Sequence, residues 1–447
     1  MQGHPHPSVS LGTSIERAQR CARWLRVILA AFLVLVAWGQ RPAQAAPSDP
    51  QAAAYRGPLA PAAGRSLVTR WPILLSHPFG NDTTRSFRGD QADARGQFDP
   101  FGVQRALERR GAVVYQPDKV AFGSHEVRGR LLYKKCAGLT LTEMLCEGPQ
   151  PVVVDGLHLA MARHCAHPGL RSQQGFDSEA ACLKGLQFNI ICHSQGCVDS
   201  RYMMVALRNE HSGLPMHRHV ASWSSLAGAN KGTAQVDLYL DLTAACLSDA
   251  CRAGVFDALL TLQSWRIDRK LVTDGGNAMI NLSQRYMLDS TDVRCKPTRG
   301  RSCPASFNER HRFPEDPEHP ILYQSFSITI NDPRHPCHSK HQLIWRYLMA
   351  KEGPNDGNIS VESQRFTTYG RNGTGGATPV VARPLSATSL DPKRPHPGMY
   401  HMAFSDYLIA GMDGGRASCR GEDNSAFRFS RIGVYEDLVA ELATRGY

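Results

Sequence analysis

Short apolar runs alternate with amphipathic segments along most of this chain. The apolar runs with the length of β-strands are Trp71–Ser76, Ala112–Tyr115, Leu186–Cys192, His219–Leu226 and Ile321–Ile330. Between them, Phe98–Arg110 and Val198–Leu207 repeat their apolar residues with the period of a helix. Strands that alternate with helices are typical of a mainly parallel sheet flanked by helices. The pattern therefore predicts an α/β fold.

The region from Val236 to Cys303 has a helical pattern that polar loops interrupt, and Ala253–Leu271 is apolar on one face. Because this block lies between two predicted strands, we expect it to form a helical cap over the sheet, at about residues 237–320 of a domain spanning 71–447. Ordinary packing helices would give the same pattern. The stretch 370–398 is rich in Gly, Pro, Thr and Arg and predicts a long surface loop.

The first residues have the organisation of a leader. Four Arg lie within residues 17–26, the apolar run Val27–Trp38 follows, and then comes Ala43-Gln44-Ala45. This order predicts a secretory signal peptide, residues 1–45, cleaved after Ala45, and hence a secreted or periplasmic protein. Residues 46–70 are predicted to be a flexible N-terminal segment. The alternative is an uncleaved anchor, but the apolar run is shorter than the ~20 residues that span a membrane.

Composition and charge narrow the class of protein. Hydrophobic residues make up 42% and charged residues 20% of the chain, which excludes a disordered chain or a coiled coil. The net charge is +11, of which the predicted leader contributes +4. The remaining Lys and Arg are scattered along the chain, so no nucleic-acid-binding surface is predicted.

The chain has 13 Cys, and twelve of them remain once Cys21 leaves with the leader. An even number of cysteines in an exported protein predicts disulfides. The close pairs are Cys136/Cys146, Cys165/Cys182, Cys246/Cys251 and Cys295/Cys303, while Cys337 and Cys419 are candidates for joining distant segments. Spacing alone does not decide the connectivity. The absence of any C-x-x-C pair disfavours a zinc site.

The strongest motif is Cys192-His-Ser-Gln-Gly196, between a predicted strand and a predicted helix. A serine on such a sharp turn presents its hydroxyl at the carboxyl edge of the sheet. The turn requires small residues two before and two after the serine. Gly196 meets this requirement, whereas Cys192 stands where Gly is usual. The motif predicts that Ser194 is a nucleophile; the alternative is a buried serine in an ordinary turn.

A nucleophilic serine needs a base and an acid that orients it, in the chain order Ser, Asp or Glu, His on such a fold. Asp356 lies in the turn Asn355–Ser360, and His401 opens an apolar stretch. These two residues are the preferred acid and base. The rivals are Asp332, at the end of a predicted strand, and His396.

Two backbone N–H groups are needed to hold the oxyanion of the tetrahedral intermediate. One is expected from Gln195, the residue after the nucleophile. The other is expected from the turn His77–Gly80, where Phe79 is the candidate because Pro78 has no N–H. The alternative is that this segment is a simple turn.

With these residues the chain resembles the secreted bacterial true lipases of the Pseudomonas and Burkholderia type, over about Trp71 to Asp413. The matching segments are Pro72–Asp82, Cys192–Tyr202, Ala221–Asp237, Asn355–Ser360 and Tyr400–Met402. The resemblance implies an α/β-hydrolase fold with an inserted helical cap. It also implies that Ser194 is the nucleophile, Asp356 the acid and His401 the base of a triacylglycerol lipase or carboxylesterase that acts through an acyl-enzyme.

Two departures from that family affect the expectations. The family holds a structural calcium partly through an Asp two residues after the catalytic His; here that residue is Ala403, and Asp406 is out of register. This departure disfavours a structural calcium, which stays open as an alternative, and no cofactor is required. The segment between Asp356 and His401 is also longer than usual.

The resemblance further implies a lipid or ester substrate, met at a lipid–water interface through a cap that opens there. A dedicated folding chaperone, common among related lipases, is a candidate partner. The alternatives are an extracellular depolymerase of short-chain polyesters such as polyhydroxyalkanoates, a short-chain carboxylesterase, and a non-catalytic binding protein with a hydrolase fold. Cys192, Pro78 and Ala403 would favour the last of these.

Overall fold

A computed structural model describes residues 55–56, 66–80, 87, 102–244, 277–298, 302–334, 342–386, 388–389, 398–404, 427–428 and 431–447. The predicted leader lies outside these residues, as do most of the segment 46–70, the helical pattern 253–271, Cys246, Cys251, Cys337 and Cys419. None of the helices in the described part of the chain is long and apolar enough to cross a membrane.

The centre of the fold is a seven-stranded sheet in the order β1-β9-β8-β7-β6-β2-β3. Its strands are β1 (Tyr55–Arg56), β2 (Ile73–Ser76), β3 (Val114–Tyr115), β6 (Phe188–His193), β7 (Val220–Leu226), β8 (Leu322–Ser327) and β9 (Val381–Ser386). Every neighbouring pair in this sheet is parallel. Small two-stranded pairs are β4 (Lys135–Cys136) with β5 (Val153–Asp155) and β10 (Thr388–Ser389) with β11 (Phe427–Arg428).

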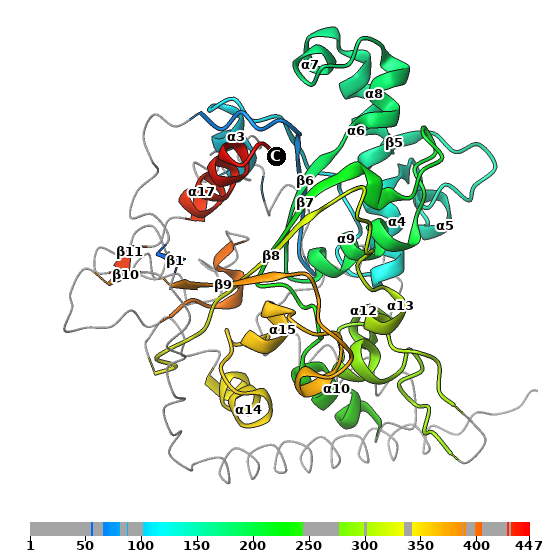
Figure 1. Ribbon diagram of the computed structural model, residues 1–447. Coiled ribbons are helices and arrows are strands. Elements are labelled where there is room, and N and C mark those ends of the chain that lie inside the picture. The colour runs from blue at the N-terminus through cyan, green and yellow to red at the C-terminus, as the bar shows by residue number, and fades with distance from the viewer. Residues whose placement is uncertain are drawn as a thin grey trace, which may run out of the picture.

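Helices cover both faces of the sheet (Figure 1). On one face lie α3 (Val103–Glu108) and α17 (Arg431–Thr444); on the other lie α4 (His125–Tyr133), α6 (Leu157–Ala166) and α9 (Gln195–Ala206). The side chains along each strand pack alternately against these two helix layers, because successive side chains of a strand point to opposite faces of the sheet. Thus Ile73 packs with the α3 and α17 side, and Leu74 with the α9 side.

Further helices lie around this layer. They are α5 (Leu141–Met144), α7 (Pro168–Gln173), α8 (Glu179–Gly185), η1 (Met216–His219), α14 (Gln342–Glu352), α15 (Val361–Arg365), η4 (Arg371–Gly373) and η5 (His401–Phe404). The described parts of the predicted cap hold most of α10 (Ala234–Ala244) together with α12 (Asn277–Ile280), η2 (Arg285–Asp289) and α13 (Phe307–Arg310). These helices share an apolar cluster with Phe79 and Val198.

The mainly parallel α/β sheet flanked by helices is confirmed, and with the sharp turn after β6 it is an α/β-hydrolase fold. One element was predicted wrongly: residues 370–398 are not a single surface loop, because β9 lies within them and pairs with β8. Val381 is exposed, and Pro384 has no N–H to donate. The strand therefore lacks an apolar pattern, and its pairing with β8 decides its conformation.

Candidate active site

The segment around Ser194 forms a sharp turn from β6 into α9. Ser194 has φ 55° and ψ −129°, a backbone conformation that non-glycine residues rarely adopt. The turn brings α9 against β2, and a Cβ on Gly196 would lie 2.4 Å from the Ser76 carbonyl oxygen and 2.6 Å from that of His77. Only glycine fits at this position. The turn holds the Ser194 hydroxyl at the carboxyl edge of the sheet.

The structure brings Ser194, His401 and Asp356 together from distant parts of the chain. His401 Nε2 lies 2.7 Å from Ser194 Oγ, and His401 Nδ1 lies 2.6 Å from Asp356 Oδ2. All three are buried; Ser194 is 6% exposed and His401 3%. Each nitrogen of the imidazole therefore has one partner, in the order that proton transfer from the serine requires.

Neutral donors hold the Asp356 carboxylate. The backbone N–H groups of Asn358 and Ile359 donate to Oδ1 at 3.0 and 2.8 Å, and Gln364 Nε2 donates to Oδ2 at 3.0 Å. Gly357 has φ +90°, so the turn Asn355–Ser360 folds back tightly enough to direct both N–H groups at one oxygen. These bonds aim the other oxygen, Oδ2, at His401.

His193, the last residue of β6, contacts His401. Its Nε2 donates to the carbonyl oxygen of His401 at 3.0 Å, and the centres of the two rings are 5.0 Å apart. His193 is fully buried, and this burial, with the proximity of His401, holds the pKa of His193 well below its usual value. His193 is therefore a neutral imidazole that fixes the backbone of His401.

The two predicted oxyanion donors belong to the segments that follow β6 and β2. Gln195 is the first residue of α9, so its N–H has no acceptor within the helix. Phe79 follows β2; its side chain is buried, and its ring meets that of Phe122 edge-on at 4.9 Å. The N–H of Gly80, the next residue, donates to Ala121 O at 2.8 Å, which ties the turn to the segment after β3.

Two buried cations hold the carbonyl groups of the Phe79 turn. Lys119 Nζ donates to Ser76 Oγ at 2.8 Å and to His77 O at 3.1 Å. Arg128 Nη2 donates to His77 O at 2.8 Å and to Pro78 O at 3.0 Å. The turn is therefore fixed by charge-assisted hydrogen bonds, which are stronger than neutral ones.

Asp199 of α9 joins both cations to the nucleophile helix. Its Oδ2 lies 2.7 Å from Arg128 Nε and 3.0 Å from Lys119 Nζ. Burial alone raises the pKa of Asp199, but the two cations lower it to about 2, so the carboxylate stays charged. Burial lowers the pKa of Lys119 to about 7, against the opposing attraction of Asp199. The sequence analysis missed these three residues, because only the fold brings them together.

The other predicted site residues lie elsewhere. Asp332 is half-buried and pairs with Arg334, its near neighbour in sequence. His396 and Asp406 lie outside the described residues, and so does the side chain of Ala403. Among the residues that the structure describes, no group of three or more His, Cys, Asp or Glu is arranged to hold a metal ion.

Three of the predicted disulfides are present: Cys136–Cys146, Cys165–Cys182 and Cys295–Cys303. A fourth, Cys192–Cys197, was not predicted. Its two cysteines flank the nucleophile segment, and their spacing of five residues is the signal that could have suggested the pair. Cys192 occupies the usual glycine position because it belongs to this bridge as well as to the turn.

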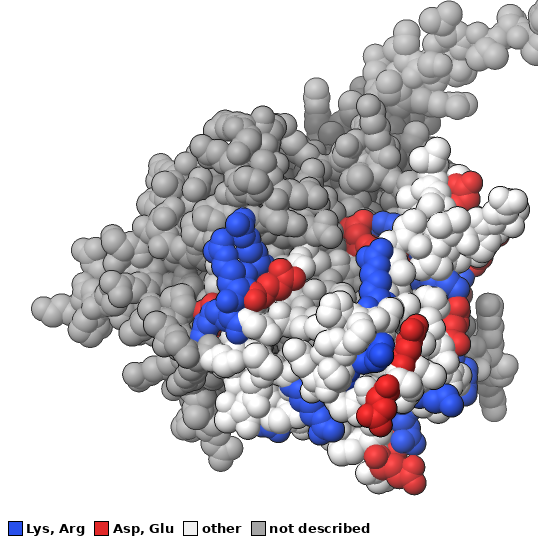
Figure 2. Space-filling view, turned by 90° about the horizontal axis from the view of Figure 1, so that it is seen from above, with Lys and Arg blue, Asp and Glu red and all other residues white. Residues whose placement is uncertain are grey.

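The charged side chains on the face seen from above do not separate by sign. Lys and Arg are interspersed there with Asp and Glu over the described residues (Figure 2). Ion pairs also occur among the charged side chains of the described residues, for example between Arg218 and Asp316. This mixed arrangement on the drawn face agrees with the scattered charge of the sequence.

No protein-family model matches this chain, and no curated protein matches it. Among solved structures, it is similar to a metagenomic carboxyl esterase, with 12% identity, coverage of 85% of this chain and 77% of that one, and a TM-score of 0.43. It is also similar to lipase 1 from Pelosinus fermentans, with 14% identity, coverage of 84% of this chain and 99% of that one, and a TM-score of 0.45. For the Staphylococcus hyicus lipase the identity is 14%, the coverage is 84% of this chain and 97% of that one, and the TM-score is 0.45.

Proposed function

We propose that this protein is a serine carboxylic ester hydrolase, a lipase or carboxylesterase, that acts through an acyl-enzyme intermediate. The observation that carries the proposal is the continuous contact from Ser194 Oγ to His401 Nε2, at 2.7 Å, and from His401 Nδ1 to Asp356 Oδ2, at 2.6 Å. A nucleophile, a base and an orienting acid in this geometry are suited to acyl transfer.

In the first half of the reaction, Ser194 Oγ forms a bond to the ester carbonyl carbon while His401 Nε2 takes its proton. Asp356 holds the imidazole in the required tautomer and stabilises its positive charge. The N–H groups of Phe79 and Gln195 bind the oxyanion. As the intermediate collapses, His401 gives its proton to the departing alcohol, and the acyl group remains on Ser194.

In the second half, water attacks the acyl carbon and gives a proton to His401. The acid is released, and the proton returns to Ser194 Oγ. The cap helices with their apolar cluster around Phe79 and Val198 favour an acyl chain as the group bound beside Ser194. The disulfides of the described residues fit export from the reducing cytoplasm. We further propose a lipid or ester substrate met at a lipid–water interface.

The test is the hydrolysis of p-nitrophenyl esters from acetate to palmitate by the oxidatively folded protein, beside Ser194→Ala. Activity that is lost in Ser194→Ala and highest on long chains supports a lipase. Activity confined to short chains indicates a carboxylesterase or polyester depolymerase. Folded protein without Ser194-dependent hydrolysis of any ester would contradict the proposal and favour the binding protein.

A further inference from the structure

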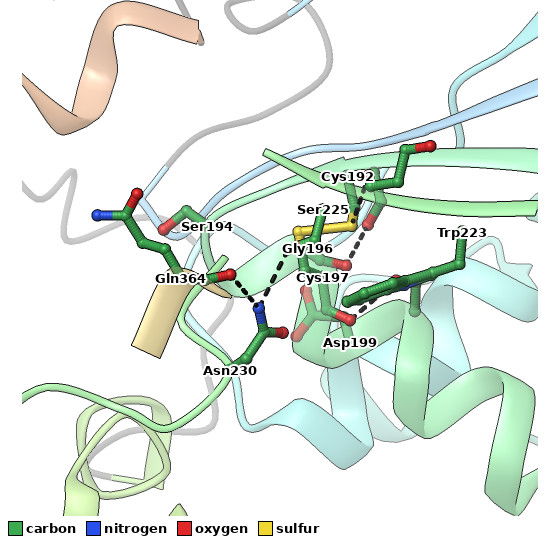
Figure 3. The surroundings of a disulfide bond; sticks show 12 residues. Cys192, Ser194, Gly196, Cys197, Asp199, Trp223, Ser225, Asn230 and Gln364 are labelled. Carbon is green, nitrogen blue, oxygen red and sulfur yellow. Dashed lines mark hydrogen bonds between the residues drawn. A yellow bond between two sulfur atoms is a disulfide. The ribbon is translucent and has the colours of Figure 1, made fainter. Parts of the chain in front are cut away.

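One disulfide lies inside the turn that carries the nucleophile (Figure 3). Cys192 is the last but one residue of β6, and Cys197 lies in the first turn of α9. Their Cα atoms are 4.8 Å apart. The loop that the bridge closes contains Ser194 and Gly196. No other disulfide among the described residues encloses a residue of the triad.

The conformation of Ser194 has to be imposed by its surroundings. Its φ of 55° and ψ of −129° are unfavourable for a residue with a side chain, and such a conformation persists only where the neighbouring structure holds it. The bond from Ser194 N to Leu226 O, at 3.2 Å, and that from Ala229 N to Ser194 O, also at 3.2 Å, are long neutral hydrogen bonds. They hold the serine backbone against β7 and the loop that follows it, and a third neutral bond, from Cys197 N to Ser194 O at 3.1 Å, connects it to the first turn of α9.

The bridge acts on the two sides of the turn directly. Relaxing the Ser194 backbone would change the relative position of the end of β6 and the start of α9. The Cys192–Cys197 bond connects these two segments covalently. Both cysteines are fully buried, in the same apolar cluster as Trp223, so neither sulfur can follow such a movement without disturbing the core.

A general stabilising role does not account for this placement. The entropy that a disulfide removes from the unfolded chain increases with the length of the loop it closes. Cys192 and Cys197 are five residues apart, whereas Cys165 and Cys182 are 17 apart and also fully buried. Among the disulfides of the described residues, the bridge with the smallest expected effect on unfolding is therefore the one that surrounds the nucleophile.

We propose that Cys192 and Cys197 are positioning residues, whose disulfide holds Ser194 in its reactive conformation. The inference rests on the proposed function of Ser194. It follows that the nucleophile becomes competent only after oxidation. In that step the two thiols form one S–S bond and lose two protons and two electrons to a disulfide oxidant, which becomes two thiols.

The first test compares variants of the full chain on a soluble p-nitrophenyl ester. Cys192→Ala/Cys197→Ala removes the bridge, and Cys192→Gly/Cys197→Ala restores the glycine usual at this turn. Cys165→Ala/Cys182→Ala is the control, because it removes an equally buried bridge between α6 and α8. We expect kcat to fall at least tenfold in both Cys192 variants with KM unchanged within twofold, and the control to keep kcat within twofold.

Three results would overturn the inference while leaving the proposed function intact, and a fourth would overturn both. A Cys192→Ala/Cys197→Ala variant with kcat within twofold of wild type shows that the bridge does not position Ser194. Full kcat in Cys192→Gly/Cys197→Ala alone shows that the turn needs only a small residue. An equal loss of kcat in the Cys165 control shows a general effect on the fold. A wild-type protein without Ser194-dependent hydrolysis contradicts the proposed function itself, and the inference with it.

A second test needs no variant and remains decisive if the variants fail to fold. Wild-type chains are refolded with limiting oxidant, labelled with a biotinylated fluorophosphonate at Ser194, captured, and mapped for disulfides by mass spectrometry. We expect the labelled chains to be enriched in the Cys192–Cys197 bridge relative to the unlabelled chains, more strongly than in Cys165–Cys182. Equal occupancy of Cys192–Cys197 in the two fractions would overturn the inference.

Discussion

The two halves of the candidate site are held by different forces. On the nucleophile side, a disulfide crosses the Ser194 turn, and Asp199 with Lys119 and Arg128 fixes the Phe79 turn through buried ion pairs. On the acid–base side, Asp356 and His401 are held by neutral hydrogen bonds. The difference follows from the backbone: the nucleophile turn contains a strained non-glycine residue, whereas the Asp356 turn places glycine at its positive φ.

The largest effect is expected from the acid–base side. Asp356→Asn should lower kcat about 10⁴-fold, because an amide at this position stabilises the wrong tautomer of His401. Steady-state kinetics on a p-nitrophenyl ester measures this loss. Asp332→Asn changes the rival acid, which is half-buried and paired with Arg334, and should leave kcat unchanged. If kcat fell in Asp332→Asn and stayed unchanged in Asp356→Asn, Asp332 would be the acid.

On the nucleophile side, Lys119→Met should lower kcat about tenfold. Losing a whole oxyanion donor costs about 10²- to 10³-fold, and here Arg128 still binds the His77 and Pro78 carbonyl groups, so the Phe79 turn shifts without losing its N–H. The free energy of unfolding, measured in urea, should fall by about 1–3 kcal/mol through the lost buried hydrogen bonds.

The matched control for that variant is Lys135→Met. Lys135 pairs with Asp118 near the surface, at 2.7 Å, and its loss should change the free energy of unfolding by less than about 1 kcal/mol. Its kcat should equal that of wild type. If Lys119→Met and Lys135→Met have the same kcat, the buried cations do not position the oxyanion turn.

The last prediction concerns the pH dependence of stability rather than catalysis, and it involves one histidine from each half. Burial, with the charges of Lys119 and Arg128, lowers the pKa of His77, and burial beside His401 lowers that of His193. Below pH 6.5 the unfolded chain therefore binds protons that the folded protein does not. The free energy of unfolding should fall as pH decreases from 6.5 towards the folded pKa values, by up to about 1.4 kcal/mol per pH unit for each histidine.

Urea unfolding at pH 7.5 and pH 5.5, with the disulfides intact, measures this dependence. His193→Asn removes one of the two buried imidazoles and should reduce the change between the two pH values. If the free energy of unfolding of His193→Asn changed between the two pH values as much as that of wild type, His193 would not be neutral in the folded protein. The variant also loses the hydrogen bond from His193 to the carbonyl oxygen of His401, so kcat is a second quantity that should change.

Much of the fold could be predicted because its signals are local. The runs that become β2, β6, β7 and β8 have the length of a strand, contain only short, uncharged polar residues beside their apolar ones except for Gln324 and His193, and are almost entirely buried, so the local pattern identifies them. β9 could not be predicted in this way. Its residues are Val-Ala-Arg-Pro-Leu-Ser, and the strand exists because β8 offers a row of backbone partners.

The sequence by itself determined the order of the candidate residues along the chain: a serine on a predicted strand-to-helix turn, then an acid in a glycine turn, then a histidine. It also indicated three disulfides, because their cysteines are close along the chain. Only the tertiary structure decided which distant groups meet. Lys119, Arg128 and Asp199 form one buried cluster, and Gln364 reaches Asp356, because the parallel sheet brings the ends of its strands to one edge. Such contacts leave no local pattern in the sequence, since their energy arises from burial between separate elements.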